Sequence, residues 1–178
     1  RYHGNGRTSR QQGNEGGYGG QWGGAEGSLW QQLLADRSDV VEGMYSTWQK
    51  TENSETFKSN MGGTGNITQF APHAYDATYL MGFAMEAAGE ASGTGIAQNV
   101  RSVSRPNGDG DTAVSVGEFE AGAEAVRNGE NIDYNGASGS VDLNQNLEPV
   151  VPYRILQVQG GEASVTEEVP LSYFEGKI

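Results

Sequence analysis

Apolar residues recur at helical spacing in several stretches of the chain. The strongest helix is predicted over residues 73–88, where one broad apolar stripe ends at Gly89. The stripe is formed by Ala77, Leu80, Met81, Ala84, Met85 and Ala88. Such a stripe is typical of a helix that packs one face against a core.

Shorter helices and strands are expected around it. A first helix is predicted from a capping box at Ser28–Gln31, with apolar residues to Leu34, and a second from a cap at Asn53 or Ser54, with Phe57 and Met61 on its apolar face and Gly62 and Gly63 at its end. A third is predicted from the apolar series Ile96, Val100 and Val103, which ends before Pro106. A fourth is predicted from a capping box at Ser115–Glu118 and the apolar residues Phe119, Ala123 and Val126, and it ends at Gly129. Strands are predicted at residues 40–45, 132–134, 139–143 and 150–158. Helices with strands between and after them indicate an α/β layer structure.

The composition adds loops to this picture. The chain has 178 residues, enough for one domain or about half of a two-lobed protein. Its hydrophobic content is 35 % and it contains 28 Gly, which indicates long loops. The Gly-dense residues 13–27 are consistent with a flexible arm, although Tyr2, Tyr18 and Trp22 are large residues that a free linker has no need of.

Charge narrows the choice of partners. The chain carries 11 Lys and Arg against 23 Asp and Glu, a net charge of −12, which opposes binding to nucleic acid or to anionic membrane surfaces. No apolar run is long enough for a membrane span, so direct membrane insertion is not expected. Residues 1–10 lack the apolar core of a signal peptide, and the chain begins with Arg1 rather than Met, so we expect a processed product, a fragment or an incomplete sequence. The acidic surface suggests a halophile.

Signatures of catalysis, metals and cofactors are missing from the sequence. The nearest match to a nucleophile elbow, residues 136–140, has the wrong spacing for G-x-S-x-G and is followed by strand-like residues. His3 and His73 have no partner at metal-ligand spacing, and the absence of Cys excludes thiolate sites. We therefore expect no enzyme, no catalytic residues, no metal site and no cofactor.

The acidic loop at residues 107–118 offers a Ca²⁺-binding alternative. Its oxygen-bearing side chains partly match the ligand positions of a twelve-residue EF-hand loop. However, Thr112 stands where the loop needs Gly, and Pro106 breaks the incoming helix. The favoured interpretation makes Asp109 and Asp111 solvated loop carboxylates and Glu118 part of a capping box.

Glu26 is the strongest candidate for ligand chemistry. It lies in a Gly-rich turn ahead of a predicted helix, and if residues 21–23 form a strand, it is placed at the carboxyl end of a sheet. A carboxylate there could bind an ammonium group. It could equally complement the dipole of the following helix, and the residues alone do not separate the two interpretations.

Four motifs together resemble a known family. They are Trp22-Gly-Gly-Ala-Glu-Gly-Ser28, Val41-Glu-Gly-Met-Tyr-Ser-Thr47, Ala74-Tyr-Asp-Ala77 and Ile132-Asp-Tyr-Asn-Gly-Ala-Ser-Gly-Ser-Val-Asp142. In order and approximate spacing they resemble the C-terminal half of type I periplasmic binding proteins, most of all the branched-chain amino acid (Leu/Ile/Val) receptors of ABC importers. The acidic composition fits a haloarchaeal member of that family.

The resemblance implies a fold and a function. The fold would be an α/β, two-lobed clamshell with three-layer α/β/α lobes and an incomplete N-terminal lobe. Residues 1–47 and 149–178 would belong to the second lobe and residues 48–148 to the first. The protein would be an extracellular or periplasmic, cell-surface-associated solute-binding protein that delivers an amino acid to an ABC permease. Glu26 would bind the ligand ammonium, and Tyr2 would pack over the ligand.

Besides the Ca²⁺-binding module, the sequence leaves a structural function open as an alternative to solute binding. The chain could be a surface structural or assembly subunit that keeps this fold without transport. Its Gly-rich N-terminal residues would then contact neighbouring molecules.

Overall fold

The computed structural model describes residues 34–63 and 70–174. Residues 34–36 are helical, and the elements that follow are α2 (Ser38–Val41), β1 (Tyr45–Gln49), α3 (Ser54–Asn60), α4 (Ala71–Ala88), α5 (Gly93–Asn99), β2 (Thr112–Ser115), α6 (Phe119–Arg127), β3 (Ile132–Gly136), β4 (Gly139–Ser140), β5 (Tyr153–Gln159), β6 (Glu162–Val169) and the 3₁₀ helix η1 (Leu171–Tyr173). The predicted capping box at Ser28–Gln31 lies outside the described residues.

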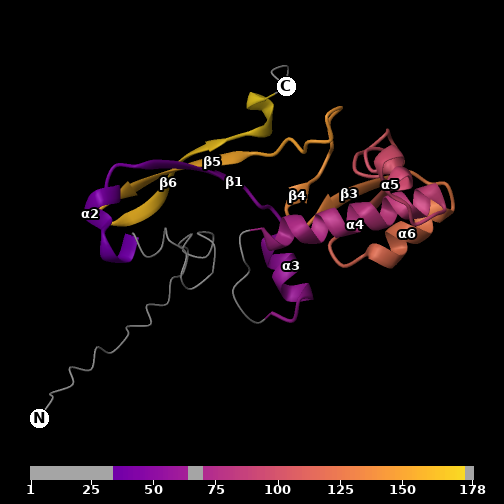
Figure 1. The fold of residues 1–178 in the computed structure, drawn as a ribbon, viewed down its shortest axis with the longest axis horizontal. Coiled ribbons are helices and arrows are strands. Elements are labelled where there is room, and N and C mark those ends of the chain that lie inside the picture. Colours follow the sequence, from indigo (N-terminus) through magenta and orange to yellow (C-terminus); the bar gives the residue numbers. More distant parts are fainter. Residues whose placement is uncertain (1–33, 64–69, 175–178) are drawn as a thin grey trace, which may run out of the picture.

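The strands form two separate sheets. In the antiparallel sheet, β5 lies between β1 and β6. In the mixed sheet, β3 pairs in parallel with β2 and antiparallel with β4. Figure 1 shows an elongated molecule, with the antiparallel sheet and α2 at one end and the mixed sheet with α3 to α6 at the other. The expected α/β class is confirmed.

The main core lies between the mixed sheet and its helices. Its buried members are Leu80, Phe83, Ala84, Val103, Val114, Ala123, Ala125, Ile132, Tyr134, Val141 and Leu143. Phe83 and Tyr134 are fully buried, and each large apolar side chain removed from water stabilises the fold by roughly 1.5–3 kcal/mol. A Cβ at Gly122 would meet the Phe83 ring at 2.8 Å, so this glycine lets α6 approach α4 closely.

Helix α4 follows the prediction in extent but not in its buried face. It begins two residues earlier than expected, with Pro72 in its first turn, and ends at Gly89, which has the predicted left-handed conformation with φ 67°. The predicted stripe is wrong at Ala77 and Met81, whose side chains are exposed. Asp76 is buried instead, because it lies on the same face as Leu80 and Phe83 and its carboxylate is fully hydrogen-bonded.

The shorter helices lie near their predicted positions, but α5 ends at Asn99, so of the predicted apolar series only Ile96 is helical, and Asn53 makes no side-chain capping bond to α3. Helix α3 closes at Gly62 and Gly63, whose φ angles are 90° and 68°. The side chain of Ser92 caps α5 by accepting a hydrogen bond from the Gly95 amide at 2.9 Å. Ahead of α6, the Glu118 carboxylate accepts from the Ser115 amide at 2.8 Å, which is one of the two bonds of the predicted capping box, but Ser115 ends β2 and the N-cap of α6 is Glu118.

Several strand predictions need correction. Residues 40–45 were expected to form a strand, but Val41 ends α2, Gly43 turns the chain at φ 79°, and β1 begins only at Tyr45. Val41 is buried and Val40 exposed, which is the asymmetry of a short amphipathic helix. The acidic loop predicted at residues 107–118 contains β2, because Val114 is buried in the core against β3.

The C-terminal strands also differ from their predicted ranges. The predicted strand 139–143 is regular only in β4, after which Leu143 forms an isolated bridge with Pro149. The predicted strand 150–158 is β5, shifted to begin at Tyr153. No strand was predicted for β6, whose alternating residues carry few apolar side chains.

Candidate functional site

Two passages of chain connect the sheets. The first leaves β1 after Gln49 and leads to α3, and the second returns from β4 to β5 at Tyr153 (Figure 1). Gln49 pairs with Tyr153, and the Lys50 amide donates to the Pro152 carbonyl at 2.9 Å. We call residues 49–53 and 149–153 the crossover ribbon, because they join the two ends of the molecule and are paired where they leave β1 and enter β5.

A pocket of about 240 Å³ lies at the crossover ribbon. It is lined by Thr47, Trp48, Gln49, Phe70, His73 and Tyr153, and we call it the crossover pocket. Its walls come from β1 and β5 on one side and from the beginning of α4 on the other. A pocket shared in this way changes shape whenever the two ends of the molecule move relative to each other.

The side chains of the crossover pocket are aromatic and amide groups. Gln49 Nε2 donates to Tyr153 Oη at 3.3 Å, which fixes both side chains on β1 and β5. The Phe70 and His73 rings meet edge to face, with centroids 5.8 Å apart. Such a lining suits an apolar side chain with a few polar contacts, and no carboxylate is among the described residues that line it.

A second pocket of about 340 Å³ lies beside the ribbon. We call it the back pocket; its lining residues are Lys50, Glu52, Ser138, Gly139, Ser140, Val150, Val151, Pro152, Glu168, Val169, Pro170 and Leu171. Because successive side chains of a strand point to opposite faces, Lys50 and Arg154 face away from Gln49 and Tyr153.

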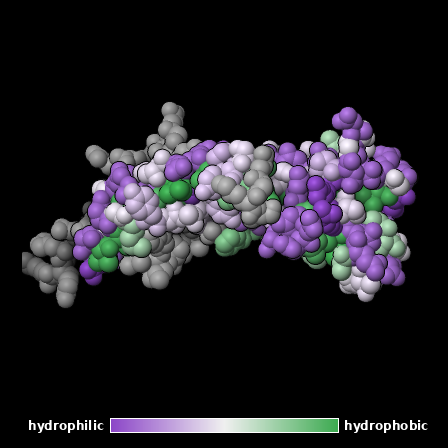
Figure 2. All heavy atoms as spheres, turned by 90° about the horizontal axis from the view of Figure 1, so that it is seen from above, coloured by the Kyte–Doolittle hydropathy of each residue, from purple (hydrophilic) through white to green (hydrophobic). Residues whose placement is uncertain are grey.

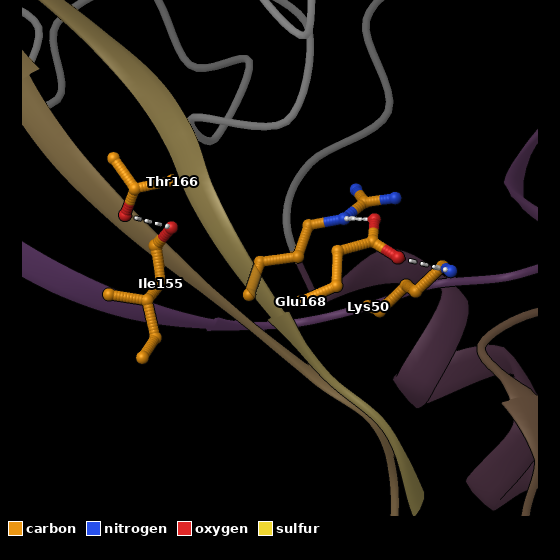
Figure 3. A network of polar contacts seen from close by, with 5 residues as sticks. Lys50, Ile155, Thr166 and Glu168 are labelled. Carbon is orange, nitrogen blue, oxygen red and sulfur yellow. Dashed lines mark hydrogen bonds and ion pairs between the residues drawn. The ribbon is translucent and has the colours of Figure 1, made fainter.

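An ion network ties the ribbon to β6 beside the back pocket. Glu168 Oε2 lies 2.9 Å from Lys50 Nζ, and Glu168 Oε1 lies 3.1 Å from Arg154 Nε (Figure 3). The hydrogen bonds from Lys50 and then Arg154 hold the pKa of Glu168 below its usual value. One carboxylate thus connects the first passage with β5 and β6.

Asp76 forms the most completely bonded polar group of the mixed-sheet end. Its side chain is 2 % exposed. Oδ1 accepts from Tyr134 Oη at 2.9 Å and from the Ala137 amide at 2.7 Å, while Oδ2 accepts from the Ser138 amide at 2.8 Å and its hydroxyl at 2.5 Å. The carboxylate of α4 therefore holds the turn between β3 and β4.

The same carboxylate contributes to a raised pKa of the Tyr134 phenol. Burial raises the pKa of the Tyr134 phenol, and the nearby charge and hydrogen bond of Asp76 raise it further, so the phenol remains a donor at any ordinary pH. Sequence reasoning used Asp76 only as part of the resemblance. A polar residue one turn before Leu80 on an apolar helix was the available signal for a buried carboxylate.

The ligand residues expected from the resemblance, Tyr2 and Glu26, lie outside the described residues. The turn at residues 136–140 contains Ser138, whose hydroxyl donates to the Asp76 carboxylate.

The loop at residues 107–118 does not form an EF-hand. Asp111 Oδ2 accepts from the Asn107 and Gly108 amides at 2.5 and 3.2 Å, and Thr112 already belongs to β2. Within residues 34–63 and 70–174, no group of three or more His, Asp or Glu side chains could hold a metal ion. The favoured interpretation of these carboxylates as loop and capping groups is thus consistent with their hydrogen bonds.

None of the helices in the described ranges is both long and apolar enough to cross a membrane. Seen from above in Figure 2, hydrophobic atoms form small separate areas among hydrophilic ones.

Comparison with known proteins identifies the family. A family model described as "Receptor family ligand binding region" matches residues 31–161. The chain is 32 % identical over 108 residues to the chemotactic signal transduction system substrate-binding protein BasB of Halobacterium salinarum, a match that covers 61 % of this chain and 25 % of BasB. It is also similar to the crystal structure of a leucine binding protein, LivK, from Thermotoga maritima, with 18 % identity and a TM-score of 0.48 over 78 % of this chain and 34 % of LivK.

The family match includes three of the four motifs that carry the resemblance, and the motif at residues 22–28 lies before it. The chain spans about a quarter to a third of the length of these two relatives. The family match covers α2 through β5, and therefore the mixed sheet, two of the three strands of the antiparallel sheet and the crossover ribbon. The chain belongs to the family of receptor ligand-binding regions, and its architecture is part of the type I periplasmic-binding-protein fold.

Proposed function

We propose that the protein is a non-enzymatic, extracytoplasmic solute-binding protein of an ABC importer, which closes two lobes on an amino acid of the branched-chain type. Residues 1–47 and 149–178 form one lobe in this proposal and residues 48–148 the other. The crossover pocket carries the proposal. It is built from both ends of the molecule at the ribbon where the chain passes between them.

The crossover pocket supports an apolar ligand side chain but leaves the charged ends of an amino acid to other groups. Phe70 and Tyr153 offer aromatic surface to such a side chain. In the proposal, Glu26 pairs with the ligand ammonium and Tyr2 packs over the ligand. Closure of the lobes would exclude water from the Glu26–ammonium pair and strengthen it, which couples binding to closure.

The partner is the second part of the proposal. Delivery to a membrane permease requires a site outside the cytoplasm, at the cell surface. The name of BasB favours one specific alternative, in which the same binding step signals to a chemotaxis system instead of a permease. A haloarchaeal origin is supported by the Halobacterium source of BasB and by the net charge of −12.

Calorimetric titration tests the binding step. The protein, together with any part of its polypeptide that precedes these residues, is titrated with L-leucine, L-isoleucine and L-valine. We expect saturable heat with at least one of them. 4-Methylpentanoate, which has the side chain and carboxylate of leucine but no ammonium, should give none, because Glu26 would lose its counter-charge.

The outcomes separate the candidate functions. The absence of heat with all three amino acids contradicts the proposal, and self-assembly of the same sample then favours a structural subunit. If leucine binds, co-purification with a permease or with a chemotaxis transducer distinguishes transport from signalling.

A further inference from the structure

The turn between β3 and β4 is attached on two sides. On one side the Asp76 carboxylate accepts its hydrogen bonds, as described above. On the other side lies the first passage of the crossover ribbon: the Glu52 amide donates to the Ser138 carbonyl at 3.3 Å, and Asn53 Nδ2 donates to the Gly136 carbonyl at 2.8 Å. Asn53 Nδ2 also lies 2.9 Å from Asn135 Oδ1. The turn therefore connects α4 to the ribbon.

The carboxylate permits little variation in where the turn lies. A buried charge is tolerated only when its hydrogen bonds are complete, since it has lost the water that solvates it elsewhere. Asp76 meets this condition with four bonds, three of which come from Ala137 and Ser138. Movement of the turn would break several of these bonds together.

The Asn53 side chain attaches the first passage of the ribbon to the turn instead of capping its own helix, α3. We call this attachment of the first passage to the turn the anchor. Asn53 precedes α3 at the position from which a side chain usually caps the helix, yet it makes no such capping bond. Its amide donates to residues of the turn and of β3 instead. The first passage is therefore attached to the turn by both a backbone and a side-chain bond, directly where α3 begins.

We propose that Asp76 is a positioning residue for lobe closure. Its carboxylate fixes the turn to which the first passage of the crossover ribbon is anchored, and so it holds the ribbon in the geometry about which the lobes rotate. This inference rests on the proposed function, because only a closing protein needs a fixed pivot. When the anchor is loosened, ligand binding must order the ribbon as well, and this ordering weakens the affinity.

Three variants separate positioning from mere stability. Asp76→Asn replaces one acceptor oxygen with a donor that faces other donors, so the turn loses its fixed position. Asn53→Ala removes the side-chain anchor and leaves the Asp76 carboxylate and its four bonds in place. Tyr134→Phe is the matched control, because it removes one bond to Asp76 inside the core and touches neither the turn nor the ribbon.

Amide hydrogen exchange gives a readout that needs no ligand. The Glu52 amide reports on the anchor, and the Thr112 amide, which donates to the Asn131 carbonyl at 2.9 Å, reports on the mixed sheet. In Asp76→Asn and Asn53→Ala we expect Glu52 to exchange about tenfold faster relative to Thr112. In Tyr134→Phe the ratio of the two rates should not change.

Affinity for L-leucine, measured by calorimetry well below the melting temperature of each variant, gives the second readout. Asp76→Asn and Asn53→Ala should weaken binding by roughly three- to tenfold, and Tyr134→Phe should leave it unchanged. Equal loss of protection at Glu52 and Thr112 in all three variants, or affinities that follow melting temperature alone, would overturn the proposal. If the unmodified protein binds no amino acid while the exchange ratio shifts as expected, the anchor exists but the proposed function fails.

Discussion

The carboxylate of Asp76 occupies the space in which a side chain at Gly136 would begin. All three of its terminal atoms lie within 2.7 Å of the position that a Cβ at residue 136 would take. Gly136 has no positive φ, so its backbone would accept any residue, and the close approach of Asp76 is what demands glycine here. The two residues form one unit, in which the missing side chain of one makes room for the buried charge of the other.

Gly136→Ala should therefore destabilise the protein strongly. The new methyl group would displace a carboxylate that cannot move without losing hydrogen bonds, and overpacking of this kind costs about 1–3 kcal/mol before those bonds are counted. Thermal or urea unfolding measures the loss. Gly93→Ala is the matched control, because a Cβ there meets nothing within 4 Å at the exposed start of α5. A Gly136→Ala protein as stable as the control would show that the turn can shift freely.

This pair also shows why the sequence predicted helix α4 but not its polar centre. Apolar spacing and the Gly89 stop are local signals, and they gave the helix and its end correctly. Which of two adjacent faces is buried depends on the partners in β3 and α6, which local spacing does not contain. A periodicity count places polar residues outside the core, so it could not include Asp76 among the buried positions.

The strands and the crossover pocket also depend on contacts between distant residues, which local sequence does not contain. Val40 and Val41 have high strand propensity, but in the structure they belong to a short helix that buries only Val41. The crossover pocket gathers residues 47–49, 70, 73 and 153, which are far apart along the chain. No motif links them, because their neighbourhood depends on the pairing of β1 with β5. Glu26 and Tyr2 stay predictions.

Asp142→Asn should stabilise the protein at neutral pH. Burial raises the pKa of the Asp142 carboxyl, and its Oδ1 is buried without a hydrogen-bond partner. The folded state therefore disfavours the charge above that raised pKa. As pH falls through it, the folded protein takes up the proton before the unfolded chain does, so the penalty disappears and the advantage of Asn shrinks.

Melting temperatures of both proteins at a series of pH values between 7 and 4 test this expectation. Asp109→Asn, which removes a charge from an exposed loop, controls for the general effect of lowering the negative charge of an acidic protein. A gain from Asp142→Asn that is no larger than the control at pH 7, or that grows as pH falls, contradicts the prediction.

The ion pair between Glu168 and Lys50 should add a small, salt-dependent amount to the free energy of unfolding. Lys50 and Glu168 are 31 % and 45 % exposed, and ion pairs at such positions contribute about 0.2–1 kcal/mol. A double-mutant cycle with Lys50→Gln and Glu168→Gln measures this coupling by urea unfolding. We expect it to decrease in high salt, because ions screen exposed charges. Since its pKa is lowered, the contribution of Glu168 is present at neutral pH and is lost as pH falls through that lowered value.

The contact between Glu168 and Arg154 also predicts how the stability of the single variant Glu168→Gln changes. The Arg154 side chain is only 7 % exposed, and Glu168→Gln removes a carboxylate partner from this largely buried cation. The loss of stability in Glu168→Gln should therefore exceed that in Lys50→Gln. Equal losses in the two single variants would show that the contact with Arg154 adds nothing.

Calcium should not stabilise the protein. Asp111 already accepts two backbone amides, and Glu118 accepts the Ser115 amide, so neither carboxylate is free to form a chelating loop with Asp109. A ligand that bound the folded state would raise the melting temperature as its concentration increased. Melting curves with millimolar Ca²⁺, and with Mg²⁺ as a control, should coincide with the curve in chelator. A rise specific to Ca²⁺ that is lost in Asp109→Ala would restore the calcium interpretation.

Glu26→Gln should weaken amino acid binding by at least about tenfold, or 1.4 kcal/mol, because the ligand ammonium loses its counter-charge inside a closed cleft. Calorimetry with L-leucine measures the change. Glu124→Gln, on the exposed side of α6, removes the same charge far from the crossover pocket and should leave the dissociation constant unaltered. If Glu26→Gln binds leucine as tightly as this control, the ammonium of the ligand must be held by another group, and the carboxylate at residue 26 is left with the alternative role of complementing the dipole of the helix predicted to follow it.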